Sequence, residues 1–335
     1  MPNSLRIVNT FPLTAADLDA IGALPGVTVV SREDVEGEAA AEELAAADVL
    51  WGELPEGDLR RAPRLRWMAR AGAGVEDLDL PALAAGGVTV TNSSGLHASS
   101  MGEFILGAIL FGSQQHAARM ALQRDHAWDP ERGWANPIRG RTIAVLGYGS
   151  IGREVARLAS SFGMRVLAAK ARPDRRADEG FQPAGVGDPE GAIPERIVGL
   201  DALHDILGEA DVVVIALPLT DATRGVLGRD TIRAMKPGAY LVNVGRGPMI
   251  DEMALIEALR EGHLAGAYLD VFDEEPLPHG HPYWDTPNLY VSPHIAGVNS
   301  YERYWAMMGP LLLENTQRLL EGLPLVNTVD PARAY

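Results

Sequence analysis

Apolar and polar residues alternate along this chain with two different periods. Short runs rich in β-branched residues, each long enough for one strand, are separated by stretches with helical spacing or helical composition. The early runs begin at Leu5, Val27, Asp48, Leu65 and Val88, and the early helical stretches cover residues 14–23 and the Ala/Glu-rich segment around Glu42. Strands and helices in alternation are typical of a parallel sheet with helices on its faces. The pattern predicts an α/β fold that starts with one small open-sheet domain.

A second and stronger α/β series occupies the middle of the chain. It follows a predicted long helix from about Ser100 into the region of Ala118, where apolar residues are too dense for a fully exposed face. Its predicted strands begin at Thr142, Met164, Asp211, Ala239, Ala265 and Asn288. Six strands with intervening helices match a dinucleotide-binding domain in number and order. Residues 172–200 are rich in Gly and Pro, so we interpret them as a surface insertion, and a last helix is predicted from about Ser300 to Glu321.

The composition narrows the range of functions. A chain of 335 residues that is 47% hydrophobic can bury the cores of two domains. Its net charge of −16 disfavours nucleic acid and anionic membrane surfaces as partners. The absence of cysteine excludes thiol nucleophiles, iron–sulfur clusters and thiolate metal sites. The first residues do not resemble a signal segment, and the apolar run from Phe104 is too short to span a bilayer. We therefore expect a soluble cytoplasmic protein.

A glycine-rich turn follows the first strand of the second series. The strand from Thr142 runs into GYGSIG, and a helix with apolar residues at three- and four-residue steps comes next. In a dinucleotide turn the first glycine permits a tight bend, the second lets the backbone approach a pyrophosphate, and the third lets helix and strand pack closely. The strand, turn and helix together favour a cofactor site over a plain structural turn. We predict cofactor contacts from Gly147, Gly149, Ser150, Ile151 and Gly152.

The end of the next predicted strand indicates which cofactor binds. An NAD-type site places an acidic residue there to hold the ribose 2′-hydroxyl, whereas this chain reads AAKAR from Ala168, with Arg175 and Arg176 close behind. A 2′-phosphate would satisfy such a cluster of cations through charge-assisted hydrogen bonds. The sequence therefore favours NADP, with Lys170 and Arg172 as the contacts. The alternative is that these cations form a solvated basic loop without a ligand, and NAD remains a possible cofactor.

Three ionisable residues lie at predicted strand ends, where open α/β sheets bind their ligands. Arg246 lies in LVNVGRG, Glu275 in DVFDEEPL and His294 in VSPHIAG. Hydride transfer to a 2-keto acid needs a cation that grips the carboxylate and polarises the carbonyl, a proton donor, and a group that supports that donor. The guanidinium, the imidazole and the carboxylate are suited to these three roles.

These segments resemble the motifs of the D-isomer-specific 2-hydroxyacid dehydrogenase family, which includes phosphoglycerate dehydrogenases and glyoxylate/hydroxypyruvate reductases. The similarity runs from about Gly72 to the tail through GAGVEDLDL, NSSG, GYGSIG, ALPLTDAT, NVGRG, DVFDEEPL and SPHIAG. The resemblance implies that Arg246, Glu275 and His294 form the catalytic set. It further implies cofactor contacts from Pro218, Thr223, Asn243, Val244, Asp270 and His294. The substrate is expected on the backbone of Ala73, Gly74 and Val75 and on Arg246, with Arg70 either a further contact or a surface residue.

The resemblance also implies how the chain is divided. A flavodoxin-like substrate domain would comprise residues 1–105 and 299–335, and a Rossmann dinucleotide-binding domain, residues 106–298, would be inserted between them. Closure of the active site would then be a hinge motion near residues 100–120 and near Val298. A homodimer through the cofactor domains is expected from the family alone.

The resulting hypothesis is an NADP(H)-dependent reductase of small 2-keto acids, D-specific by resemblance. Arg246 would hold the substrate and His294, supported by Glu275, would donate the proton, so reduction should weaken as the pH rises. The alternatives are an NAD-dependent phosphoglycerate-type dehydrogenase, a phosphite-oxidising enzyme with a similar triad, and a dinucleotide-sensing module without turnover. The HGH segment from His279 has no obvious third ligand beside it, so we expect no metal.

Overall fold

The computed structural model describes residues 4–31, 37–54, 58–75, 77–178, 180–297 and 301–332. The chain forms two compact units. Unit 1 consists of Met1–Leu96, Glu179–Pro183 and Asn299–Tyr335, and unit 2 consists of His97–Asp178 and Ala184–Val298. The chain therefore passes between the units four times, twice within the predicted insertion. The hinge predicted near Val298 lies outside the described residues, and the domain boundary at residue 105 remains a prediction.

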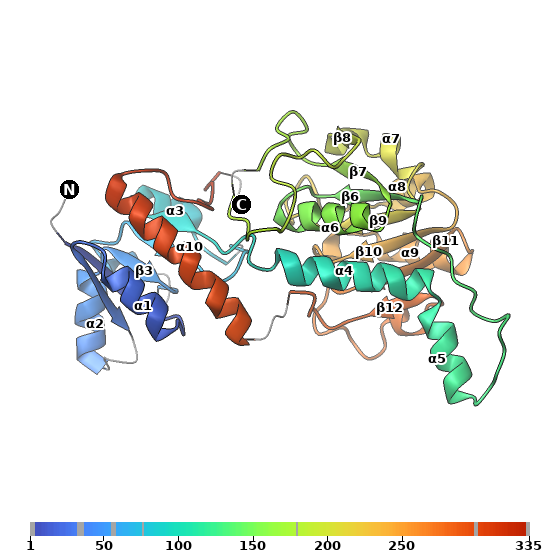
Figure 1. The fold of residues 1–335 in the computed structure, drawn as a ribbon, viewed down its shortest axis with the longest axis horizontal. Helices are drawn as coiled ribbons and strands as arrows, with labels where there is room; N and C mark the ends of the chain where they lie inside the picture. Colours follow the sequence, from blue (N-terminus) through green and yellow to red (C-terminus); the bar gives the residue numbers. More distant parts are fainter. Residues whose placement is uncertain are drawn as a thin grey trace. The chain divides into compact units, whose positions relative to one another are not determined.

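Unit 1 is built on a five-stranded parallel sheet in the order β2-β1-β3-β4-β5 (Figure 1). Its strands are β1 (Leu5–Asn9), β2 (Val27–Ser31), β3 (Val49–Trp51), β4 (Trp67–Ala69) and β5 (Thr89–Thr91). Its helices are α1 (Ala15–Gly22), α2 (Gly37–Ala46), α3 (Leu80–Ala85) and α10 (Tyr301–Glu321). This is the flavodoxin-like strand order, and all five predicted strands are confirmed.

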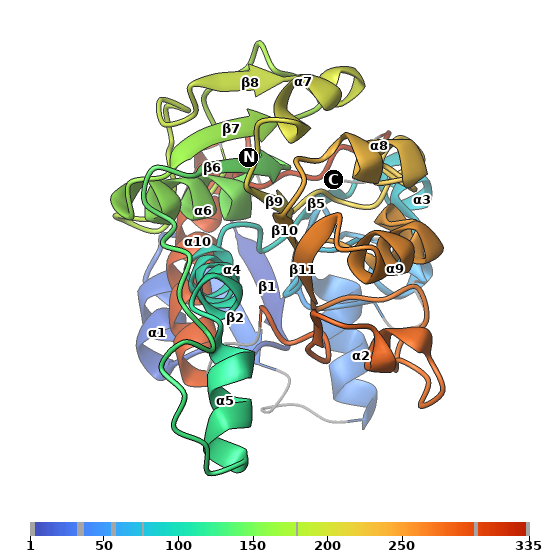
Figure 2. The same ribbon diagram turned by 90° about the vertical axis from the view of Figure 1, so that its right-hand side faces the viewer.

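Strand periodicity explains why both faces of this sheet are covered. Successive strand residues point to opposite faces. Ile7 and Trp51 pack into one core with residues of α1 and α10, whereas Val8 and Leu50 pack into the other with residues of α2 and α3. Helices α1 and α10 lie side by side in both ribbon views (Figures 1 and 2).

Unit 2 is built on a seven-stranded parallel sheet in the order β12-β11-β10-β9-β6-β7-β8. Its strands are β6 (Thr142–Leu146), β7 (Arg165–Ala169), β8 (Arg196–Val198), β9 (Val212–Ile215), β10 (Ala239–Asn243), β11 (Leu264–Leu269) and β12 (Leu289–Val291). Helices α4 (Ala98–Ser113) and α6 (Ser150–Ser161) cover one face, and α7 (His204–Leu207), α8 (Arg229–Ala234) and α9 (Glu252–Arg260) cover the other. The order reverses between β6 and β9, as in dinucleotide-binding sheets, so the predicted Rossmann fold is confirmed.

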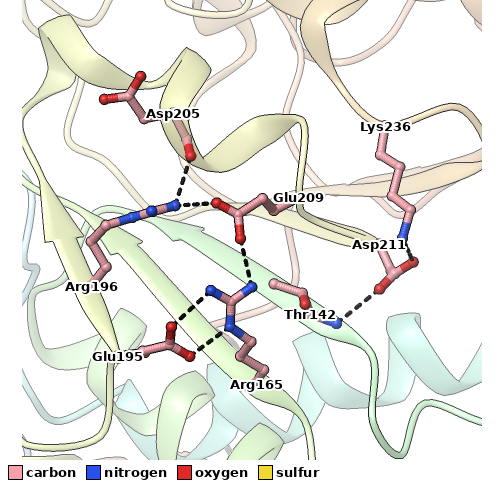
Figure 3. Close-up of polar contacts among 8 residues, drawn as sticks. All are labelled: Thr142, Arg165, Glu195, Arg196, Asp205, Glu209, Asp211 and Lys236. Carbon is pink, nitrogen blue, oxygen red and sulfur yellow. Dashed lines mark hydrogen bonds and ion pairs between the residues drawn. The ribbon is translucent and has the colours of Figure 1, made fainter.

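Strand β8 lies inside the predicted insertion, so the prediction of six strands was one short. Three residues are too few for a periodic signal. The strand pairs with β7 and is reinforced at its amino end by an ion-pair network (Figure 3). Arg196 donates to the Asp205 carbonyl oxygen over 2.7 Å and pairs with Glu209, which Arg165 also contacts at 2.6 Å. Hydrogen bonds from Arg165 lower the pKa of Glu209.

The predicted single helix from Ser100 to Ala118 is wrong at its carboxyl end. Helix α4 stops at Ser113 and a separate helix, α5 (His116–Arg124), begins after Gln115, whose φ of +54° is left-handed. The last carbonyl groups of α4 find other partners, because Gln115 Nε2 donates to Gly112 (3.1 Å) and the Asn136 amide donates to Ser113 (2.7 Å). Figure 1 shows α5 projecting beyond α4 into a long loop. None of the described helices has the length and apolar character that a membrane span requires.

Candidate active site

The glycine turn lies between β6 and α6, and the structure gives a steric reason for two of its three glycines, Gly147 and Gly152. Gly147 has φ +103°, and a Cβ there would lie 2.4 Å from the carbonyl oxygen of Ala216. A Cβ on Gly152 would lie 2.0 Å from the carbonyl oxygen of Gly147, so helix and strand pack as closely as predicted. A Cβ on Gly149 would meet no atom of the described chain within 4 Å. The amino end of α6 therefore opens onto free space, which suits a pyrophosphate.

The basic cluster after β7 is partly occupied by its own loop. The Lys170 Nζ atom donates to the carbonyl oxygen of Arg175 over 2.6 Å, and burial, followed by the nearby charge of Arg153, lowers the pKa of Lys170. Arg176 donates to two carbonyl oxygens farther along the insertion, at 3.0 and 2.8 Å. Arg172 is exposed. Of the two predicted phosphate contacts, Arg172 extends into solvent and Lys170 is half-buried.

A hollow of about 630 Å³ lies beside this cluster at the carboxyl ends of β7 and β8. It is lined by Ala171, Pro173, Ile197, Val198, Gly199, Leu200, Asp201, Ala202 and Ala222. This surface was not predicted from the sequence, because β8, which supplies one wall, was not predicted. Consecutive apolar residues at Ile197 and Val198 were the available signal, but they are too few to distinguish from a loop.

The segment that carries Arg246 is shaped by two neighbouring residues. Asn243, buried at the end of β10, accepts from the Gly245 amide (3.0 Å) and donates to the Arg246 carbonyl oxygen (3.2 Å). A Cβ on Gly247 would lie 1.9 Å from the Phe272 carbonyl carbon. Glycine at this position therefore lets the loop after β10 contact the loop after β11. Asn243 acts here as a loop-holding residue, and its contact with the nicotinamide pocket remains a prediction.

Glu275 and His294 form a hydrogen-bonded pair at this edge of the sheet. Glu275 Oε2 lies 2.7 Å from His294 Nδ1, and Glu275 Oε1 accepts from the Phe272 amide over 2.9 Å. A carboxylate offers only acceptors, so Nδ1 carries the hydrogen in this contact. The His294 side chain is half exposed. The loops after β10, β11 and β12 thus bring Arg246, Glu275 and His294 to one sheet edge.

Asp270 binds the loop that carries the histidine. Its carboxylate is buried and accepts from the Ser292 hydroxyl (2.5 Å) and from the amides of Ile295 (3.0 Å) and Ala296 (2.8 Å). The His294 amide donates to the Asp270 carbonyl oxygen (2.9 Å). The described hydrogen bonds of the Asp270 carboxylate are therefore with this loop, and its predicted contact with the cofactor stays a prediction.

The remaining predicted cofactor residues lie at the ends of β9 and β10. Thr223 is buried, and its hydroxyl donates to the Pro218 carbonyl oxygen over 2.7 Å, so it closes the turn after β9. Pro218 is exposed, and Val244 is buried directly after β10. Thr223 therefore stabilises the turn after β9, and the Pro218 side chain is accessible to solvent.

The predicted substrate loop belongs to unit 1. Asn92 Nδ2 donates to the carbonyl oxygen of Ala73 (2.8 Å), and the Ser93 amide donates to that of Gly72 (3.2 Å). Val75 is buried and anchors the end of the loop. The NSSG segment thus holds the carbonyl oxygens of this loop.

Arg70 is occupied by acidic side chains of the same unit. Its Nη2 atom lies 2.8 Å from Asp77 and 3.7 Å from Glu53, and its side chain is only 14% exposed. Arg70 is therefore a paired, largely buried residue and not a plain surface cation. Two carboxylates around one guanidinium leave a net negative charge beside the substrate loop.

Comparison with known proteins identifies the family. Residues 106–296 match the family model described as the NAD-binding domain of the D-isomer specific 2-hydroxyacid dehydrogenases. The chain belongs to that family. The match covers more than half of the 335 residues and spans the glycine turn, Arg246, Glu275 and His294. The predicted family is confirmed, and the protein is an NAD(P)-dependent 2-hydroxyacid dehydrogenase.

Relatives of this chain are named for different substrates. A glyoxylate reductase from Aeropyrum pernix is 34% identical over 286 residues, covering 81% of this chain and 78% of the relative. A D-3-phosphoglycerate dehydrogenase from Methanocaldococcus jannaschii is 30% identical over 93% of this chain but only 56% of its own length. Among solved structures, a family member from Xanthobacter autotrophicus in complex with NADPH and MES is 30% identical, with a TM-score of 0.75 and coverage of 99% and 100%.

Proposed function

We propose that this dehydrogenase reduces small, uncharged-tail 2-keto acids such as glyoxylate or hydroxypyruvate with NADPH and forms the D-hydroxy acid. The observation that supports the proposal most strongly is the hydrogen bond of 2.7 Å between Glu275 Oε2 and His294 Nδ1. It lies at the sheet edge where Arg246 also lies. An imidazole backed by a carboxylate and accompanied by a guanidinium has the parts that carbonyl reduction requires.

In this mechanism Arg246 binds the substrate carboxylate and polarises the keto oxygen. Glu275 accepts from Nδ1 of His294 and stabilises the imidazolium, which leaves the Nε2 hydrogen to be donated to the keto oxygen. The nicotinamide cofactor supplies the hydride when bound. Because the reacting form of His294 is protonated, the reduction rate should fall as the pH rises. An initial-rate profile at saturating substrate measures this.

The residues of unit 2 fit a phosphorylated dinucleotide. The open amino end of α6 at Gly149, followed by Ser150 and Ile151, would hold the pyrophosphate. Lys170 and Arg172, next to the hollow between β7 and β8, would hold a 2′-phosphate. The residues at the end of β7 include no carboxylate that could receive a ribose 2′-hydroxyl.

The charge around the substrate loop favours a small uncharged tail. A phosphorylated keto acid would bring a dianion toward Arg70, whose charge is already balanced by Asp77 and Glu53. Like-charge repulsion would weaken that substrate. Glyoxylate and hydroxypyruvate carry only the carboxylate that Arg246 and the backbone of Ala73–Val75 would bind.

The test is an initial-rate panel in which glyoxylate, hydroxypyruvate and 3-phosphohydroxypyruvate are each assayed with NADPH and with NADH. The proposal requires the highest kcat/KM with NADPH and an unphosphorylated keto acid. A preference for NADH and the phosphorylated substrate would instead establish the phosphoglycerate-type activity. Binding of NADPH without reduction of any keto acid would establish a sensing module.

The proposed assembly is a homodimer through unit 2. Helix α5 has no buried residue, and the loop after it exposes Trp128 (96%) and Trp134 (72%). Large apolar side chains exposed on one element mark interaction surfaces. Light scattering after gel filtration should give twice the mass of one chain. Replacing both tryptophans by serine should lower the measured mass toward that of a monomer.

A further inference from the structure

One buried arginine of α6 holds the insertion between β7 and β8 to unit 2. Arg153 has no exposed surface, and its guanidinium donates to the carbonyl oxygens of Asp188 (2.5 Å) and Arg176 (2.6 Å). Its Nε atom lies 3.2 Å from an oxygen of Asp178. Arg176 and Asp178 precede residues 179–183, and Asp188 follows them. The Arg153 side chain therefore binds the insertion on both sides of residues 179–183, and we call these two flanking segments the arms of the insertion.

The insertion is also bonded to the glycine turn itself. Tyr148, which stands between two of the turn glycines, is buried and donates from its hydroxyl to Asp188 over 2.6 Å. Burial and this bond raise the pKa of Tyr148, so the hydroxyl stays a donor. Asp188 in turn accepts from the amides of Ala192 and Ile193 at 3.0 Å. Both arms therefore start beside the proposed pyrophosphate site.

Between these anchors, residues 180–183 belong to unit 1. Phe181 packs against the core formed with α1 and α10, and its amide donates to Asn327 Oδ1 over 2.9 Å. A Cβ on Gly95 would lie 2.0 Å from the Phe181 carbonyl oxygen, and Gly95 has φ +95°. The glycine of the NSSG loop is thus required by the approach of the insertion as well as by its own backbone.

Asn327 connects Phe181 to the substrate loop. Its Nδ2 atom donates to the carbonyl oxygens of Ser94 (2.8 Å) and Asn92 (3.2 Å), while its Oδ1 atom accepts from Phe181. Asn92 then donates to Ala73 over 2.8 Å. Contacts within unit 1 therefore run without a gap from Phe181 to the loop that we assign to the substrate carboxylate.

We propose that residues 180–183 form a strap that positions the substrate-carboxylate loop, with Phe181 as its positioning residue. The assignment of Ala73–Val75 to substrate rests on the proposed function, whereas the contacts of Phe181 do not. Loss of the Phe181 ring would remove the packing that holds its backbone in place, so its amide bond to Asn327 and its approach to Gly95 would loosen. A displaced loop binds the substrate carboxylate less well. Since the strap is covalently continuous with the anchors at the glycine turn, one segment serves both ligand sites.

The test compares Phe181→Ala with Phe181→Leu and with Phe162→Ala, a matched change at an exposed phenylalanine of unit 2. Phe181→Ala should raise KM for the keto acid about tenfold. Its kcat and its Kd for NADPH should stay within about twofold of the wild type. Phe181→Leu, which keeps an apolar side chain, should restore most of the lost affinity, and Phe162→Ala should change neither constant.

Hydrogen–deuterium exchange of the same full-length proteins separates positioning from general unfolding. Phe181→Ala should speed exchange in peptides covering residues 71–75 and 92–96 and leave residues 143–155 unchanged. An unaltered KM together with unaltered exchange in those peptides overturns the strap, as does a larger effect on NADPH than on the keto acid. If the wild type reduces no keto acid, the proposed function fails, and the exchange data alone still decide whether the strap exists.

Discussion

At each of two loops of this protein one side chain makes three hydrogen bonds, but the chemistry of the two side chains differs. In unit 2 the Asp270 carboxylate accepts from one hydroxyl and two amides of the loop that carries His294. In unit 1 the Asn327 amide donates to two carbonyl oxygens of the NSSG loop and accepts from Phe181. A carboxylate only accepts, whereas an amide can satisfy both kinds of group.

The difference indicates which loop is the more rigid. Bonds to a buried carboxylate are charge-assisted and stronger than bonds between neutral groups. The histidine loop is therefore bound tightly by a residue of its own unit, close to it in the sheet. The NSSG loop is bound by neutral contacts from the tail and the insertion, which are easier to displace. We expect changes around Asp270 to affect turnover and stability, and changes around Asn327 to affect substrate affinity.

The largest expected effect lies in the histidine loop. His294→Ala removes the proposed proton donor, and kcat for keto-acid reduction should fall about 1,000-fold. NADPH affinity, followed by fluorescence titration, should change little. His279→Ala, an exposed histidine near the same edge, is the control and should retain wild-type turnover. A His294→Ala protein with normal kcat would contradict the catalytic assignment.

Asp270→Asn tests the stronger of the two loop contacts. The substitution places an NH₂ group where three donors converge, so at least one buried donor loses its partner, and the free energy of unfolding should fall by about 3 kcal/mol. Urea denaturation measures this, and kcat should fall with it because His294 is misplaced. Asp273→Asn, at an exposed aspartate nearby, should change neither quantity. Equal stability of the two variants would mean that the Asp270 carboxylate does not organise the loop.

The proposed cofactor site of unit 2 consists of residues that are close together in the sequence. Lys170→Asp combined with Arg172→Ala should raise Kd for NADPH about 30-fold, because charge-assisted bonds to the 2′-phosphate are lost. The Kd for NADH, measured on the same protein, should change far less and serves as the internal control. An equal rise in Kd for NADPH and NADH would show that these cations do not bind a 2′-phosphate.

Asn327→Ala tests the weaker, neutral contact of unit 1. It removes the three hydrogen bonds that join Asn327 to Asn92, Ser94 and Phe181, and KM for the keto acid should rise about tenfold while kcat stays near its normal value. Thr328→Ala, at the exposed neighbouring residue, is the matched control. A fall in kcat without a change in KM would remove the distinction between the two loops.

The smallest expected effect concerns His97 at the start of α4. Burial lowers the pKa of His97, and a backbone hydrogen bond with Gly297 offsets part of the shift. The His97 imidazole therefore binds a proton more readily in the unfolded chain than in the folded protein. The stability associated with neutral His97 is complete above pH 6.5, the ordinary value, and is lost as the pH falls below it. His97→Asn should make the urea midpoint less dependent on pH between 6.5 and 5, whereas His279→Asn should leave the dependence unchanged.

Local patterns in the sequence were enough for the fold class and for the motifs of unit 2. Each of the five early strands, the Gly147–Gly152 turn and the family could be predicted, because periodicity and glycine spacing are properties of neighbouring residues. The resemblance to the family implied that Glu275 supports His294, and the hydrogen bond between them agrees with it.

The contacts made by Arg153, Phe181 and Asn327 were decided by the tertiary structure. Phe181 and Asn327 are 146 residues apart, and Asn327 lies 235 residues from Asn92. No local period or motif records such pairs. Strand β8 escaped prediction because three residues carry no periodic signal, and the break after α4 escaped it because it depends on the left-handed backbone of Gln115 and on a contact with Asn136. The sequence alone determined which chemical groups follow the strands. Only the folded chain determined which distant backbone segments Arg153, Phe181 and Asn327 bind.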